Sequence, residues 1–166
     1  MLIVYQILSY SQLILMLSSQ LFSYLTNYLR YNHDMNISFH HIAITVQNLI
    51  ESVRWYQDIF GFKKTHEYSK DDMTIVLLQK DSVRIELFAF RSETTALPEY
   101  RKELMKDLRT EGTKHICIEV ENLEKMIKKL QSRGEEPLGK PDEIFFGGRN
   151  LFVKDPCGNL IELFQS

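Results

Sequence analysis

Cysteine is scarce in this sequence, which has two such residues, Cys117 and Cys157, in 166. Two cysteines are too few for a disulfide framework, and they lack the spacing of a metal site. An excess of basic charge is also missing: the formal net charge is -2, whereas nucleic-acid-binding domains carry a basic patch. We therefore expect one globular domain in a reducing, cytoplasmic setting, with no nucleic-acid partner.

Charged side chains are absent from residues 1–29. The segment has neither the basic start nor the small-residue cleavage site of a signal peptide. It is long enough to span a membrane, but polar residues interrupt its apolar run. These are Gln6, Gln12, Ser18, Ser19, Gln20 and Asn27. We favour an accessory apolar extension over residues 1–38, which a start codon upstream of Met35 would explain. Membrane contact through residues 1–30 and docking on the protein's own surface stay open.

The rest of the chain contains a repeat. Residues 40–49 read HHIAITVQNL and residues 114–123 read KHICIEVENL, with His, Val, Asn and Leu at matching places. Each phrase predicts a short strand followed by an asparagine N-cap and an amphipathic helix. A repeat of this length, present twice, favours two paired modules over a solenoid.

The two modules continue in the same order. In the first, we expect a helix that Asn48 and Glu51 begin and Gly61 ends, then strands at 74–79 and 82–90. In the second, we expect a helix ended by Gly134 and strands on either side of a turn at 155–158. RIELF at 84–88 matches LIELF at 160–164. The linker between the modules predicts a short helix at about 97–109, with its charges on a solvated face.

Each module opens with a strand histidine and closes with a strand glutamate. The histidines are His41 and His115, and the glutamates are Glu86 and Glu162. A glutamate between apolar strand residues is costly to bury unless it is paired or bound to a metal. Two imidazoles and two carboxylates suit a divalent ion such as Zn²⁺, Ni²⁺, Co²⁺, Mn²⁺ or Fe²⁺.

Other interpretations of the same residues exist. Each histidine alone could be a core residue, and each glutamate alone a surface residue at a strand edge. The duplicated positions favour a metal site instead. His40 and His66 have no counterpart in the repeat, so we interpret them as ordinary surface residues or as neighbours of the ligands.

These motifs resemble a known family. HHIAITVQNLIESVRWYQDIFGFK, IELF, KHICIEV and DPCGNLIEL are similar to the vicinal oxygen chelate superfamily, which includes glyoxalase I, bleomycin-resistance proteins and extradiol dioxygenases. The resemblance covers residues 39–165, with modules at 39–90 and 114–165. It implies an α+β fold in which paired βαβββ modules form a curved sheet around a metal ion, commonly in a homodimer.

The resemblance also implies roles for the four residues. In bacterial glyoxalase I the matching positions bind one metal ion per site, for which Ni²⁺ or Zn²⁺ is expected here. The implied reaction is that of a glyoxalase I-like lyase on the hemithioacetal of methylglyoxal and a thiol, through a metal-stabilised enediolate. Glu162 would be the base that takes the proton from carbon, and Glu86 would serve the opposite face.

Two positions depart from the pattern of glutathione-using glyoxalases. Thr45 and Phe90 stand where those enzymes often carry the Arg and Asn that contact glutathione, so another thiol or another small α-hydroxycarbonyl substrate is open. We expect a substrate pocket lined by Thr45, Phe88, Phe90, Cys117 and Arg149, with a surface arginine as the alternative interpretation of Arg149. Alternative functions are an extradiol dioxygenase, an epimerase, or a bleomycin-resistance-type binding protein without catalysis.

Overall fold

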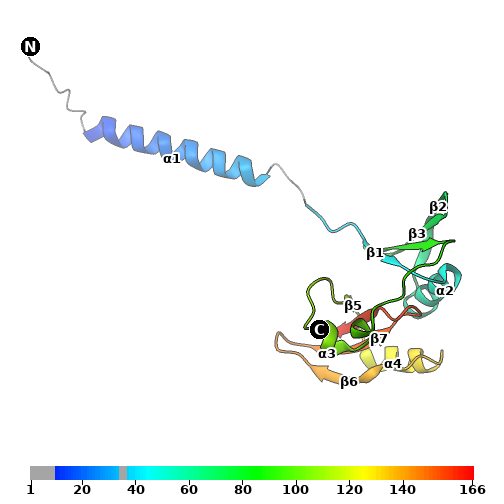
Figure 1. Cartoon of the computed structure of the whole chain (residues 1–166). Helices are drawn as coiled ribbons and strands as arrows, with labels where there is room; N and C mark the ends of the chain where they lie inside the picture. Colours follow the sequence, from blue (N-terminus) through cyan, green and yellow to red (C-terminus); the bar gives the residue numbers. More distant parts are fainter. Residues whose placement is uncertain (1–9, 34–36) are drawn as a thin grey trace, which may run out of the picture. The chain divides into compact units, whose positions relative to one another are not determined.

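The computed structural model describes residues 10–33 and 37–166, so residues 1–9 and Met35 of the expected extension lie outside the described residues. The chain divides into two compact units, Met1–Phe39 and His40–Ser166. The first unit contains helix α1 (Tyr10–His33), which Figure 1 shows in blue. Among the described helices, none has the length and apolar character needed to cross a membrane.

The second unit begins with a βαβββ module. Its elements are β1 (Ile42–Thr45), α2 (Leu49–Phe60), β2 (Lys63–Lys70), β3 (Met73–Lys80) and β4 (Val83–Phe90). The strands form a sheet in the order β1-β4-β3-β2. β1 runs parallel to β4, and the other neighbours are antiparallel.

The second module repeats this arrangement. Its elements are β5 (Ile116–Glu119), α4 (Leu123–Gln131), β6 (Leu138–Glu143), β7 (Arg149–Lys154) and β8 (Leu160–Gln165), and the sheet order is β5-β8-β7-β6. β5 pairs with β8 in parallel, as β1 does with β4. The predicted α+β fold of paired βαβββ modules is confirmed, as two four-stranded mixed sheets in the described part of the chain.

The helix caps form as the sequence predicts. The side chain of Asn48 accepts a hydrogen bond from the backbone N–H of Glu51, and that of Asn122 accepts one from Lys125. Gly61 ends α2 in the left-handed conformation, with φ of 77°, where glycine has no steric penalty. α4 ends earlier than expected, at Gln131, and Gly134 follows the turn after it.

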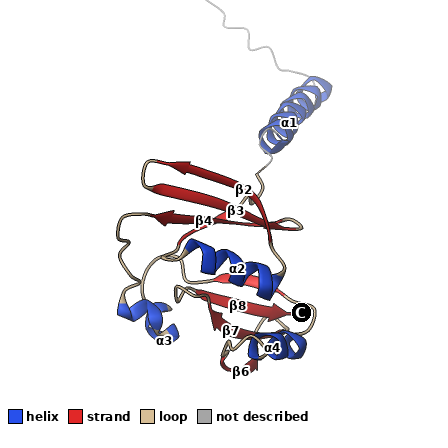
Figure 2. Ribbon diagram, turned by 90° about the vertical axis from the view of Figure 1, so that its right-hand side faces the viewer, coloured by secondary structure: helices blue, strands red, loops and turns tan. Residues whose placement is uncertain are grey.

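Helix α2 joins the two modules into one core. Figure 2 shows it between β4 of the first sheet and β8 of the second. Tyr56, which is fully buried, donates a hydrogen bond to Asp155 Oδ2 at 3.2 Å. Trp55 Nε1 donates to Glu135 Oε1 at 2.8 Å, beyond the end of α4. Buried side chains of both modules therefore pack in one apolar cluster.

Three elements differ from the sequence pattern. β2 was not predicted, because all eight residues are exposed and no alternation marks the strand. β6 was missed because its sequence, LGKPDE, contains Gly and Pro, which are rare inside strands. The linker forms a 3₁₀ helix, η1 (Glu99–Lys102), and a short α3 (Leu104–Asp107) in place of one helix, because Glu103 between them is extended.

Candidate metal centre

Helix α2 contacts β4 of the first sheet and helix α4 contacts β8 of the second, and we call the other face of each sheet its open face. On β4, Ile85 and Leu87 are fully buried, and Glu86 between them points to the opposite face. On β8, Ile161 and Leu163 are fully buried on either side of Glu162. Strand alternation therefore carries both glutamates to the open faces.

The first predicted pair is formed by His41 and Glu86. His41 Nε2 lies 3.3 Å from Glu86 Oε2, and both side chains are partly exposed. The other ring nitrogen of His41, Nδ1, lies 2.7 Å from Nδ1 of His40. Histidines that bind a metal normally have a partner at their second nitrogen, and His40 occupies that place beside His41.

The second pair is tighter and more enclosed. His115 Nε2 lies 2.8 Å from Glu162 Oε2, and the Glu162 side chain is 12% exposed, compared with 24% for Glu86. Asn150 Nδ2 donates a hydrogen bond to Glu162 Oε1 at 2.6 Å. The Phe152 ring packs edge-on against His115, with ring centroids 5.2 Å apart. Glu162 is therefore held at both of its oxygens.

The strand register shows that the two pairs occupy equivalent places. Ala43 of β1 is the register partner of Glu86, and Cys117 of β5 is the register partner of Glu162. Cys117 is exposed, yet desolvation of the thiol and the neighbouring Glu162 carboxylate raise its pKa to about 11. The thiol is protonated at neutral pH, which makes Cys117 a lining residue and a poor nucleophile.

The four predicted ligands lie in two separate pairs. Among the described residues, no group of three or more His, Cys, Asp or Glu side chains lies close enough to hold one metal ion. Each pair brings one imidazole nitrogen close to one carboxylate oxygen. Both are atom types that bind divalent ions, so the chemistry of the donor set fits a metal ion. In addition, His115 Nδ1 is buried without a hydrogen-bond partner in the described protein.

The predicted pocket residues fall into two groups. Thr45 and Phe88 are register partners on β1 and β4, and Phe90 ends β4, 37% exposed. Arg149 is placed differently: its guanidinium pairs with Glu124 of α4, with N and O 2.7 Å apart. Side chains two residues apart on a strand point to the same face. Arg149 is therefore on the same face as the buried residues Leu151 and Val153, which is the face that the helices cover.

The sequence interpretation did not assign Asn150 or Phe152 to the site. A weak signal was present, because both alternate with the buried residues Leu151 and Val153 and must share the open face with Glu162. The sequence allows His40 to be either a surface residue or a neighbour of the ligands, and in the structure its side chain contacts His41.

A cavity of about 520 Å³ lies beside the second pair. Its lining comes from β1, from the linker between the modules, from the start of β5 with His115, and from the turn that leads into β8. The lining residues are Ile42–Gln47, Thr94–Leu97, Arg101, Lys102, Thr113–Ile116, Cys157, Asn159 and Leu160. The cavity is therefore lined by the predicted pocket residue Thr45 and by His115, one of the two predicted histidine ligands.

Comparison with known proteins gives a family match across this unit. The family model described as the Glyoxalase/Bleomycin resistance protein/Dioxygenase superfamily matches residues 38–163. A Caenorhabditis elegans protein, "Putative protein C31H2.4", is 28% identical over 93 residues, which are 56% of this chain and 24% of that protein. The chain therefore spans about a quarter of the length of this curated relative.

Solved structures share the fold. A glyoxalase family protein from Enterococcus faecalis is 25% identical, with a TM-score of 0.65 over 76% of this chain and 96% of that one. A glyoxylase/bleomycin resistance protein/dioxygenase domain from Frankia sp. EAN1pec is 20% identical, with a TM-score of 0.65 over 80% and 93%. Glyoxalase I from Zea mays is 19% identical, with a TM-score of 0.59 over 76% of this chain and 44% of that chain.

Proposed function

Because the chain belongs to the Glyoxalase/Bleomycin resistance protein/Dioxygenase superfamily, we propose that it is a metal-dependent, glyoxalase I-like lyase or isomerase. Its substrate would be a thiol hemithioacetal of methylglyoxal or a similar small α-hydroxycarbonyl compound. The observation that carries this proposal is the pair of equivalent His–Glu contacts on the open faces of the two sheets. Superfamily members that only bind a small molecule need no such set.

His41, Glu86, His115 and Glu162 would hold the ion, with Ni²⁺ or Zn²⁺ as the first candidates. A bound divalent ion would polarise two neighbouring oxygens of the substrate and so acidify the adjacent C–H. Glu162 would take this proton through its carboxylate and return it to the next carbon. Asn150 would keep the carboxylate in one orientation by its hydrogen bond to Oε1.

Because the two His–Glu pairs are separate, the way in which one metal ion can bind all four residues depends on how the modules or chains assemble. One ion can collect both pairs if the two modules close on each other, or if the first module of one chain meets the second module of another. We propose the second arrangement, a homodimer, as in the family resemblance. Two inactive variants, Glu86→Gln and Glu162→Gln, test it when mixed after unfolding and refolded together. A shared site regains activity in the mixed dimer, because one of its two sites then has all four ligands. A site within one chain stays inactive.

Metal content is the first measurement for this function. We expect about one Ni²⁺ or Zn²⁺ per full-length chain, and weaker binding in Glu162→Gln. Glu119→Gln is a matched control, because Glu119 is exposed on β5 and belongs to neither pair. Assays of hemithioacetals made with several thiols then identify the substrate. Redox-active iron would indicate a dioxygenase, and a folded protein without metal affinity would overturn the proposal.

A further inference from the structure

All the charged residues that line the cavity beside His115 are positively charged. Arg101, Lys102 and Lys114 line it, and no Asp or Glu is among its lining residues. Threonine and asparagine side chains add hydroxyl and amide groups, namely Thr45, Thr94, Thr95, Thr113 and Asn159. A cavity of about 520 Å³ is within the usual range for small-molecule sites, roughly 300–1,000 Å³.

The three cations are not neutralised to the same degree. Arg101 pairs with the buried Asp107 at 3.3 Å and donates to the backbone oxygen of Thr113 at 2.9 Å, so it mainly fixes the linker. Lys102 pairs with Glu99 one turn earlier, at the exposed surface. Lys114 is half-buried, and no carboxylate of the described residues pairs with it. The uncompensated charge therefore lies next to His115.

The walls of the cavity also offer backbone groups. β1 pairs with β4, and β5 pairs with β8. Both β1 and β5 are edge strands of their sheets. Residues of β1, and Ile116 at the start of β5, line the cavity. Edge strands present N–H groups without a strand partner, and these donors favour an acceptor-rich ligand.

We propose that this cavity binds the anionic group, a carboxylate or a phosphate, of the small molecule whose reacting end reaches His115. Lys114 is the principal contact and Lys102 the second. That the reacting end meets His115 rests on the proposed function, whereas the anion site itself does not. Lys114 and Lys102 would thus supply the positive charge that the chain lacks at Thr45, where glutathione-using glyoxalases often carry an arginine.

The test uses the full-length chain, a metal chelator and low ionic strength, with backbone amide NMR to follow binding. The probes are malonate, inorganic phosphate and the uncharged malonamide. We expect malonate or phosphate, and not malonamide, to shift the amides of residues 94–97 and 113–116. Stronger binding of malonate would identify a carboxylate ligand, and stronger binding of phosphate a phosphorylated one.

Variants locate the site. Lys114→Met should weaken binding of the better anion about tenfold, the change that corresponds to about 1.4 kcal/mol of binding free energy. Adding Lys102→Met should weaken it further. Lys128→Met is the matched control, because Lys128 is exposed on α4 and does not line this cavity. Equal binding by wild type and Lys114→Met, or shifts with malonamide alone, would overturn the proposal.

The same experiment separates the two proposals. Glu162→Gln should bind the anion as the wild type does in the presence of chelator, because Glu162 does not line the cavity. Loss of metal affinity with intact anion binding would overturn the proposed function and leave the anion site standing. Intact metal affinity without anion binding would overturn the anion site and leave the proposed function standing.

Discussion

Asn150 holds Glu162 through a hydrogen bond of 2.6 Å, and no amide side chain of the described residues donates to Glu86 in the same way. Phe152 faces Glu162 across β7 and β8, and Leu77 faces Glu86 across β3 and β4. Asn150 lies two residues before Phe152, and Ile75 lies two residues before Leu77 at the equivalent place in the first module. The duplicated modules therefore differ at this position, and one glutamate is fixed more firmly than the other.

The first prediction concerns this hydrogen bond. Asn150→Leu keeps the side-chain size and removes the donor, so the Glu162 carboxylate loses a constraint. Partners of metal ligands typically contribute 10–100-fold to metal affinity, and we expect Zn²⁺ or Ni²⁺ to bind at least about tenfold more weakly by calorimetry. Ile75→Leu changes the equivalent place in the first module and should leave affinity unaltered. Equal affinities for wild type and Asn150→Leu would contradict the positioning role.

The second prediction concerns Asp155, which is 4% exposed. Its carboxylate accepts hydrogen bonds from the backbone N–H groups of Cys157 and Asn159, at 2.9 and 2.8 Å, and from Tyr56. Asp155→Ala leaves these donors without their acceptor, and we expect the free energy of unfolding to fall by about 3 kcal/mol. Urea unfolding measures the change. Asp142→Ala, at an exposed site on β6, should cost much less; a similar cost at both would contradict the prediction.

The third prediction concerns alkaline pH. Burial, and then the Asp155 carboxylate, raise the pKa of Tyr56 well above its usual value. The unfolded phenol ionises near ~10, so above this pH the unfolded state releases a proton that the folded state retains. Stability must then fall as pH rises, by up to about 1.4 kcal/mol per pH unit from this group. Urea unfolding from pH 9 to 11 should show a shallower decline for Tyr56→Phe. Parallel curves for the two proteins would argue against a raised pKa.

The fourth prediction concerns Gly148, in the turn before β7. Its φ is +86°, and a Cβ there would lie 2.4 Å from the backbone oxygen of Gln165 and 2.7 Å from the Phe164 ring. Gly147 has a similar φ of +94°, but a Cβ there would contact nothing within 4 Å. Both alanine variants carry left-handed strain of about 1–2 kcal/mol. Gly148→Ala should cost about 1–3 kcal/mol more, because it also overpacks the end of β8. Equal unfolding midpoints for the two variants would contradict this.

The sequence predicted those parts of the fold that leave a local pattern. Asn48 and Asn122 start helices because their side chains satisfy free N–H groups nearby in the chain. The duplicated His and Glu positions followed from strand alternation. β2 leaves no such pattern, because a strand exposed on both faces has no hydrophobic alternation to detect.

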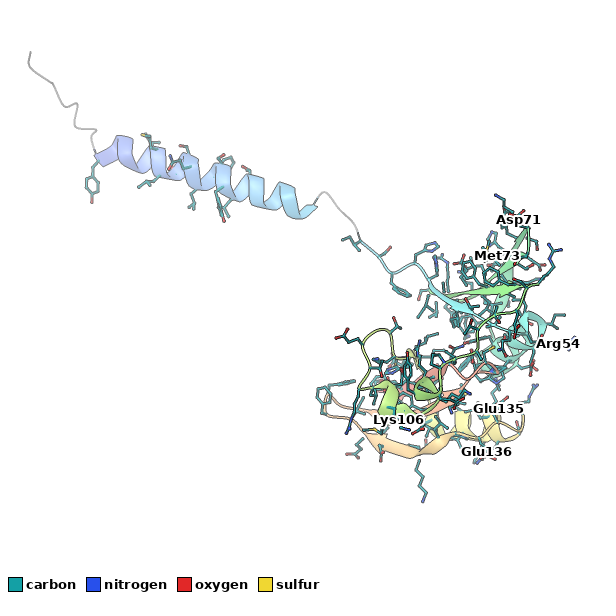
Figure 3. All side chains as sticks on the ribbon, in the orientation of Figure 1. Arg54, Asp71, Met73, Lys106, Glu135 and Glu136 are labelled. Carbon is teal, nitrogen blue, oxygen red and sulfur yellow. The ribbon has the colours of Figure 1, made fainter. Side chains whose placement is uncertain are left out.

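The site depends further on contacts between distant parts of the chain. The contact between Asn150 and Glu162 follows from the antiparallel register of β7 and β8. The cavity brings together β1, the linker and the start of β5, so the linker charges could not be distinguished from a solvated surface by sequence alone. Figure 3 shows the charged residue Lys106 on α3 of this linker, and Glu135 and Glu136 beyond the end of α4.

The exposed strand β2 bears on how copies of this chain meet. A long edge strand is a template for uncontrolled pairing, and proteins commonly protect such strands with lysines and bulges. β2 carries Lys63, Lys64 and Lys70, and its register shifts between Lys64 and His66. Pairing two such strands would bring like charges together along an irregular ladder. Self-association is thereby discouraged at this edge of the sheet, so the contact of the homodimer proposed above is expected on another surface of the unit.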